Sequence, residues 1–248
     1  MMKKSLLFIV LFLYLQGTAQ ILNIESYRIH TDTTGWAGKI GFDFSLTKNT
    51  KSLMSIGNKS HIQYKFKNNL ILLLGQYSLL VSDNDNLIDK SILHLRYNHY
   101  FTAKIIGEWF VQGQRNAVSK IDFRGLAGAG LRFKLSKNNK YRYYYGSTLM
   151  YETEKTTADI TGVLWRWSNY FSFTISPVKS MSFVSTTYYQ PAFDNFSDYR
   201  IASQNVFFFL LSKHLNFKTT FNYNYDSSPV VDVPKTQYNL SSGIVYIF

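Results

Sequence analysis

Residues 215–225 read LNFKTTFNYNY, and this run decides the fold. Its odd-numbered positions, from Leu215 to Tyr225, are mostly apolar or aromatic, whereas its even-numbered positions carry Asn, Lys and Thr. Because successive side chains of a β-strand point to opposite faces of a sheet, this period of two predicts a strand with one apolar and one polar face. Residues 36–46 repeat the pattern and predict a second such strand.

Similar alternation continues along the chain and gives twelve candidate strands in all. The other ten are residues 54–66, 71–81, 87–101, 105–115, 121–133, 141–153, 160–175, 181–189, 199–211 and 237–248. Short connections lie at residues 67–69, 102–103, 136–139, 176–179 and 212–214. They alternate with longer polar loops at residues 82–89, 116–120, 154–159, 191–198 and 226–234, although the first connection of this second set, 47–51, is short. An even strand count with alternating short turns and longer loops is typical of an outer-membrane β-barrel whose termini lie on the periplasmic side.

A soluble β-sandwich or a lipocalin-like barrel would show the same alternation, so the direction of the apolar face needs separate evidence. Most candidate strands carry Lys or Arg on the polar face, which is more charge than a filled soluble core accepts. Aromatic residues gather near strand ends, as at Tyr141, Tyr143, Tyr145, Trp165 and Trp167, which suits interfacial girdles. We therefore predict an all-β fold, a single antiparallel transmembrane β-barrel of the outer-membrane type with about 12 strands over residues 35–248.

The composition narrows the chemistry that this barrel could carry. The chain has 248 residues, no cysteine and only 17% charged residues, against roughly 25% in ordinary soluble domains. Without cysteine there is no disulfide, no thiolate metal site and no catalytic thiol. No His and carboxylate spacing suits a metal either, so we predict no cofactor and no metal site.

The first residues predict export. Lys3 and Lys4 precede an apolar run at residues 6–15, and small residues end at Ala19, which is the pattern of a cleaved signal peptide over residues 1–19. Ten apolar residues are too few to span a bilayer as a helix. Residues 20–34 form an N-terminal segment that could pair as a strand, lie on the periplasmic side or enter the lumen, and the sequence does not choose among the three.

The charge balance points to partners in the cell envelope. The formal net charge is +12, and removal of the leader takes away two lysines. A basic chain can indicate nucleic-acid binding, but an exported protein does not meet the genome. We therefore expect outer-membrane lipid and lipopolysaccharide as the anionic partners, in the outer membrane of a Gram-negative cell.

Several segments carry a family resemblance: Ile24-Glu25, Gly35-Trp36-Ala37-Gly38, residues 125–131, Tyr188-Tyr189-Gln190-Pro191 and the closing residues 243–248. Together they resemble the salt-induced outer membrane protein family, a group of barrels classed as a domain of unknown function. The resemblance implies an outer-membrane barrel whose terminal Tyr246 and Phe248 form the C-terminal signal read by the barrel-assembly machinery, with periplasmic chaperones as further partners. It implies no catalytic residue.

Alternation also predicts which polar side chains face the lumen. These are Lys39, Asp43, Lys59, His61, Gln63, Lys90, His94, Arg96, Glu108, Gln112, Asp122, Arg124, Arg132, Arg142, Glu152, Arg166, Gln204 and Lys218, in which basic residues outnumber acids. Counting outward from the turn at Thr102 puts Arg96 opposite Glu108 and predicts an interior ion pair. Two interpretations stay open: a narrow anion-favouring channel lined by positive charge, or a polar plug in which the charges pair and fill the space of a structural envelope protein.

An outer-membrane enzyme that modifies lipids is the alternative class of function. It would need a serine activated by histidine, yet Ser91 and His94 fall on opposite faces of one strand. The glycine-rich residues 125–130 lie within a strand and lack the Lys-Ser ending and the helix of a phosphate loop. Their small side chains instead predict sheet curvature or close approach inside the barrel. We predict no catalytic residues.

Overall fold

The computed structural model describes residues 34–48, 52–82, 85–136, 140–158, 160–178, 180–212 and 215–246, without the side chains of residues 85, 86, 216, 245 and 246. The predicted leader, nearly all of the N-terminal segment and Phe248 lie outside this range, as does the side chain of Tyr246. The strands are β1 (Gly35–Lys48), β2 (Ser52–Phe66), β3 (Asn69–Ser82), β4 (Asp85–Tyr100), β5 (Ile105–Asn116), β6 (Ile121–Lys134), β7 (Tyr141–Thr156), β8 (Thr161–Val178), β9 (Met181–Pro191), β10 (Tyr199–Leu210), β11 (Leu215–Asp226) and β12 (Thr236–Tyr246).

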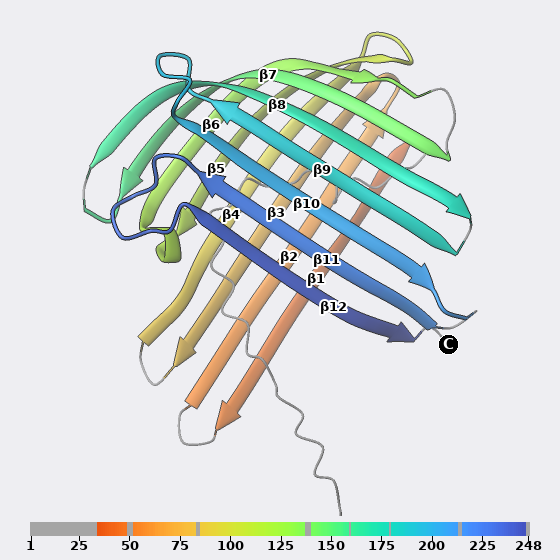
Figure 1. Ribbon diagram of the computed structural model, residues 1–248. Helices are drawn as coiled ribbons and strands as arrows, with labels where there is room; N and C mark the ends of the chain where they lie inside the picture. The colour runs from red at the N-terminus through yellow and green to blue at the C-terminus, as the bar shows by residue number, and fades with distance from the viewer. Residues whose placement is uncertain are drawn as a thin grey trace, which may run out of the picture.

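These strands form one antiparallel sheet of 12 strands in sequential order, with each strand hydrogen-bonded to the next. Figure 1 shows the sheet curling on itself, so that β9–β12 lie in front of β1–β5 and β6–β8 make the turn between the two sides. A single 3₁₀ turn, Ala117–Ser119, interrupts the strands within the described part of the chain. The all-β prediction and its strand count are confirmed.

Side chains sort by face as the alternation predicts. Trp165, Trp167 and Tyr145 point outward and are exposed, as are Leu240 and Ile244 near the end of the chain. The inward faces of β4–β10 are mostly buried and largely polar. An apolar outer belt around a polar interior is the reverse of a soluble protein and is what a bilayer requires.

The predicted long loops are partly wrong. Only the β9–β10 and β11–β12 connections, residues 192–198 and 227–235, are long, whereas β3 and β4 extend to Ser82 and from Asp85 across the predicted loop at 82–89. Polar side chains do not prevent backbone pairing where a strand leaves the membrane, so polarity alone overestimates loop length.

Asp122 was predicted to face the lumen and does not. The ladders of β6 are irregular at its first residues, with register shifts between Gln114 and Asn116 and between Ile121 and Phe123. A bulge inserts one residue and reverses the faces beyond it. Ile121 and Arg124 are therefore both buried while Asp122 is exposed.

Strand β1 is the most open part of the sheet. Within the described residues no ladder joins β1 to β12, and nearly every side chain of β1 is exposed. Because the strand number is even, these two edges run antiparallel to each other, which is the orientation that closes a barrel.

Glycines on the inner face of β6 and β7 leave room for aromatic rings from neighbouring strands. A Cβ atom added to Gly128 would lie 2.5 Å from the Phe110 ring, and one added to Gly146 would collide with the ring of Tyr170. The prediction that the glycine-rich segment allows close approach inside the barrel is confirmed. At Gly146 the missing side chain lets the Tyr170 ring cross its neighbouring strand.

This geometry makes Gly146 sensitive to any added atom. We expect Gly146→Ala to lower the free energy of unfolding by about 1–3 kcal/mol, because a buried ring must move to admit the methyl group. Urea unfolding of the detergent-solubilised barrel, followed by tryptophan fluorescence, measures the change. The matched control is Gly162→Ala in β8, where an added Cβ meets nothing within 4 Å. Equal effects of the two substitutions would contradict this account.

Candidate functional site: the ion-paired lumen

Most of the predicted lumen residues lie inside. Those that are buried are His61, Gln63, Lys90, His94, Arg96, Glu108, Gln112, Arg124, Arg132, Glu152 and Arg166, and Arg142 and Gln204 are half-buried on the same face. Lys39, Asp43 and Lys59 share the face of His61 but are exposed, because they lie on β1 and the adjoining part of β2. Lys218 is also exposed, with its Nζ 5.4 Å from the ring centroid of Phe208.

The predicted ion pair between Arg96 and Glu108 is present, with Nη1 of Arg96 3.1 Å from Oε2 of Glu108. The predicted register is wrong by two residues, because Arg96 stands opposite Phe110 and Glu108 stands opposite Asn98. The pair forms nonetheless because a long side chain reaches its diagonal neighbour on the same face.

Further hydrogen bonds extend this pair across the lumen. The Tyr170 hydroxyl, on β8, donates to Oε2 of Glu108 at 2.8 Å. Arg96 Nε donates to Nε2 of His94 at 3.3 Å, while Nδ1 of His94 lies 2.9 Å from Oε1 of Gln112. An imidazole that accepts at Nε2 must carry its proton on Nδ1, so these contacts assign a neutral His94.

A second cluster lies where β6, β7, β8, β10 and β11 meet their longer connections. Glu152 is its centre: Arg200 Nη1 donates to both carboxylate oxygens at 2.7 and 2.9 Å, and Arg166 Nε lies 3.2 Å from Oε2. Arg124 Nε donates to Glu154 at 2.6 Å, and Arg200 Nη2 donates to the same carboxylate at 3.3 Å.

Two aspartates complete this cluster from the edge of the barrel. Arg200 Nε donates to Asp226 at 2.8 Å, and Arg166 Nη1 donates to Asp198 at 3.1 Å. Three guanidinium groups thus meet four carboxylates. Charges removed from water are tolerated only when they are paired and hydrogen-bonded, and here each arginine has at least two carboxylate partners.

Four members of this cluster were not among the predicted lumen residues: Glu154, Asp198, Arg200 and Asp226. Arg200 has the same parity as Gln204, which the alternation does place inside, so the signal was present in the sequence. Glu154, Asp198 and Asp226 fall in segments that polarity marks as loops, and only the fold shows that these segments turn inward.

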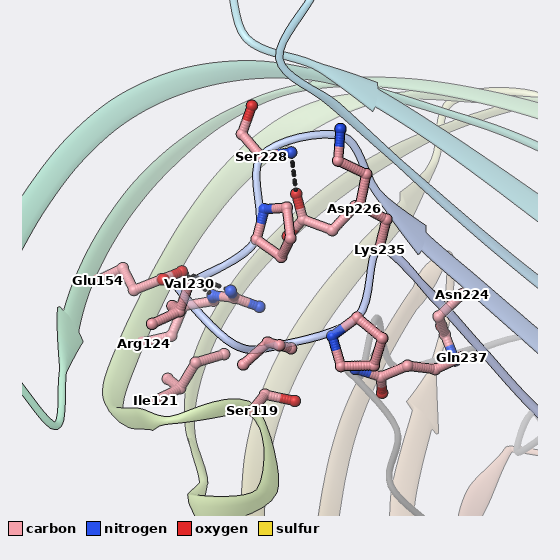
Figure 2. A pocket seen from close by; sticks show the side chains of 13 residues that line it. Ser119, Ile121, Arg124, Glu154, Asn224, Asp226, Ser228, Val230, Lys235 and Gln237 are labelled. Carbon is pink, nitrogen blue, oxygen red and sulfur yellow. Dashed lines mark hydrogen bonds and ion pairs between the residues drawn. The ribbon is translucent and has the colours of Figure 1, made fainter.

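The β11–β12 connection covers this end of the lumen. Lys120 Nζ, at the start of β6, donates to the Val231 carbonyl and to Oδ2 of Asp232, both at 2.9 Å. Figure 2 shows the loop curving back so that Val230 lies beside Arg124 and Glu154. The Lys120–Asp232 pair is solvent-exposed, with 77% of the Asp232 side chain accessible.

Described side chains fill the lumen between β4 and β10. Arg132, Arg166 and Glu108 are each 1% exposed, so bulk water does not reach them. The Arg132 guanidinium stacks on Tyr144, 3.9 Å from the ring centroid. Between the two polar clusters remains a cavity of about 40 Å³, bordered by His94, Gln112, Ser168 and Tyr170, which has room for water.

Among the described residues, no three His, Asp or Glu side chains come together in a way that could hold a metal ion. No helix in the described ranges is both long and apolar enough to span a membrane.

The comparisons with known structures agree with this architecture. The chain resembles the NanC porin with a TM-score of 0.50 and 6% identity, covering 84% of this chain and 100% of that one. Similar but more distant are the translocator domain of the autotransporter NalP from Neisseria meningitidis (TM-score 0.42, 11% identity, 91% and 92% covered) and OccK11 (OpdR) from Pseudomonas aeruginosa (0.40, 9%, 84% and 82%). No curated protein matches the chain.

The fold and its polar lumen define an outer-membrane β-barrel protein. A family model matches residues 38–248, so the chain belongs to the family described as "Protein of unknown function, DUF481".

The cluster around Glu152 supports a stability prediction. We expect Glu152→Gln to lower the free energy of unfolding by about 3 kcal/mol, because it leaves buried guanidinium groups without their shared carboxylate. Urea unfolding of the barrel in detergent measures the loss. Asp232→Asn is the control: it removes one carboxylate charge from an exposed pair, which contributes about 0–1 kcal/mol. A Glu152→Gln barrel as stable as this control would show that the cluster does not support the fold.

Proposed function

We propose that this barrel is a structural, lipid-facing component of the outer membrane whose lumen is closed to solutes at rest. The observation that carries the proposal is the burial of the charged side chains between β4 and β10, where carboxylates of the Glu108 and Glu152 clusters pair with arginines. Of the two interpretations of the lumen, this favours the polar plug. A channel through this region would have to displace ion pairs whose attraction is strongest where water is excluded.

A narrow, anion-favouring channel is the second candidate, and the β11–β12 loop favours it. Lys120, just before β6, holds this loop through an exposed ion pair to Asp232 and a hydrogen bond to the Val231 carbonyl, and exposed pairs of this kind contribute little. Arg142 on β7 is half-buried and Lys218 on β11 is exposed, and both place positive charge on the lumen side. Movement of the loop would open the end of the barrel that it covers.

Planar-bilayer recording separates these two roles. We expect the wild-type barrel to pass no steady current, because the charged side chains between β4 and β10 are buried and paired. The informative variant replaces residues 227–234 by Asn-Gly, since the backbone N–H of Asp226 already donates to the Lys235 carbonyl at 2.9 Å and a two-residue turn can close that hairpin.

The structural role predicts that the loop variant is also silent, whereas the gated channel predicts anion-selective current from the loop variant and none from the wild type. Heat-modifiable migration on gels confirms that each protein is folded. Lys120→Gln with Asp232→Asn removes only the contacts of Lys120 to the loop, so the gated channel predicts a smaller current from it and the structural role predicts none. Steady current through the wild type would overturn the proposal.

We propose no enzymatic role. The contacts of His94 and His99 do not support the lipid-modifying alternative. His94 is held by Gln112 and Arg96, and Nδ1 of His99 lies 2.8 Å from Oδ1 of Asn69. A serine activated by one of these two rings would have to displace those partners.

Assembly and export form the last part of the proposal. They rest on the sequence: a leader over residues 1–19, and closing residues that include Tyr246 and Phe248 as the signal for the barrel-assembly machinery and its chaperones. The outward, exposed Tyr238, Leu240 and Ile244 on the same strand support that role. Membership among the salt-induced outer membrane proteins, a finer statement than the family match, is proposed on the segments quoted above.

A further inference from the structure

Five hairpin connections lie at one end of the barrel, because the strands are antiparallel and in sequential order. They link β2–β3, β4–β5, β6–β7, β8–β9 and β10–β11, at the end where β1 begins and β12 ends. In outer-membrane barrels this is the periplasmic end. We call these connections the periplasmic rim: residues 67–68, 101–104, 135–140, 179–180 and 211–214.

The rim is purely cationic. Every one of its connections contains lysine and none contains Asp or Glu, giving Lys67, Lys104, Lys137, Lys140, Lys179 and Lys213. Three of these, Lys137, Lys179 and Lys213, lie outside the described residues and count here from the sequence alone.

The opposite end has a different balance. Its six connections, residues 49–51, 83–84, 117–120, 157–160, 192–198 and 227–235, hold three lysines and five aspartates. The six lysines give the rim a charge of +6, and three lysines with five aspartates give the other end a charge of −2. The two ends therefore differ by eight charges. Charge on this chain is sorted along the barrel axis.

Lysines of the rim stand beside exposed apolar side chains. Lys67, Lys104 and Lys140 are exposed. Phe101 and Leu135, in the connections of Lys104 and Lys140, are 56% and 57% exposed, and Leu211, in the β10–β11 connection, is 49% exposed. Apolar side chains that enter the acyl region, with lysines reaching back to the headgroups, are the signature of a membrane interface. Binding of a soluble polyanion would require the lysines but not the exposed apolar side chains.

Among the described residues, Glu108, close to the start of β5, does not neutralise the rim. It is buried and already bonded to Arg96 and to Tyr170. Its carboxylate therefore belongs to the lumen network and is not a partner of the exposed lysines.

We propose that the periplasmic rim binds the headgroups of anionic phospholipids, of the phosphatidylglycerol type, in the periplasmic leaflet of the outer membrane. Each lysine near a membrane surface adds to the attraction for anionic lipid, and salt weakens it. The inference deepens the proposed structural role and depends on it only through the placement of the barrel in the membrane. It gives the barrel a preferred lipid shell at one end.

Spin-labelled lipids test the proposal directly. The barrel, purified from outer membranes, is reconstituted into phosphatidylcholine vesicles that contain traces of spin-labelled phosphatidylglycerol or phosphatidylcholine. Electron paramagnetic resonance then gives the fraction of each label immobilised by the protein. We expect a preference of about threefold for phosphatidylglycerol at low salt, which falls as sodium chloride is added.

Two triple variants locate that preference. Lys67→Gln, Lys104→Gln and Lys140→Gln together should reduce it by at least half, because they remove described lysines of the rim. Lys48→Gln, Lys155→Gln and Lys235→Gln remove the same charge from exposed positions at the other end and should leave it nearly unchanged. Both variants must keep heat-modifiable migration, which shows that they are folded.

Other outcomes would overturn the proposal. These are equal immobilisation of the two labels by the wild type, a preference that survives in the rim variant, and a preference lost equally in both variants. Binding of soluble polyphosphate to the rim without any lipid preference would assign the surface to a free polyanion instead. Steady current through the wild type would overturn the closed-lumen role and leave this inference standing, so the two failures are distinguishable.

Discussion

Backbone hydrogen bonding is the constraint on which the rest of this structure depends. In hydrocarbon no water is available to an unpaired N–H or C=O, so strands can cross a membrane only as members of a continuous ladder. The 12 strands follow this rule with the simplest topology, in which each pairs with its neighbour in sequence, from the β1 edge to the β12 edge. Once the ladder fixes the backbone, side chains on one face must suit lipid, and those on the other are free to be polar.

That freedom produces the charged lumen. Polar groups inside the barrel are cut off from lipid by the sheet and, where packing is tight, from water as well. The carboxylates of Glu152 and Glu108 are therefore stabilised by hydrogen bonds from more than one donor each. Burial makes each of these contacts stronger and makes any unpaired charge expensive. A lumen built this way is a polar core held together by ion pairs and hydrogen bonds.

The two ends of the barrel face different surroundings, and the chain treats them differently. Long connections and aspartates gather at the end where the β11–β12 loop covers the lumen, whereas the rim has short turns, lysines and exposed apolar side chains. Neither pattern is needed to close a sheet. Both follow if the two ends meet chemically distinct surfaces, with charge on the turns able to vary because turn side chains take no part in the ladder.

The sequence by itself determined the strands, the face of nearly every residue and the end of the barrel to which each turn belongs, because all of these follow from a period of two and from chain order. Only the tertiary structure decided the rest. A bulge put Asp122 outside, a register two residues from the one expected still allowed Arg96 to reach Glu108, and curling of the sheet brought Arg124, Glu152, Arg200 and Asp226 together. Alternation is local and is written in neighbouring residues, whereas bulges, diagonal reach and convergence across several strands depend on the curvature of the whole sheet.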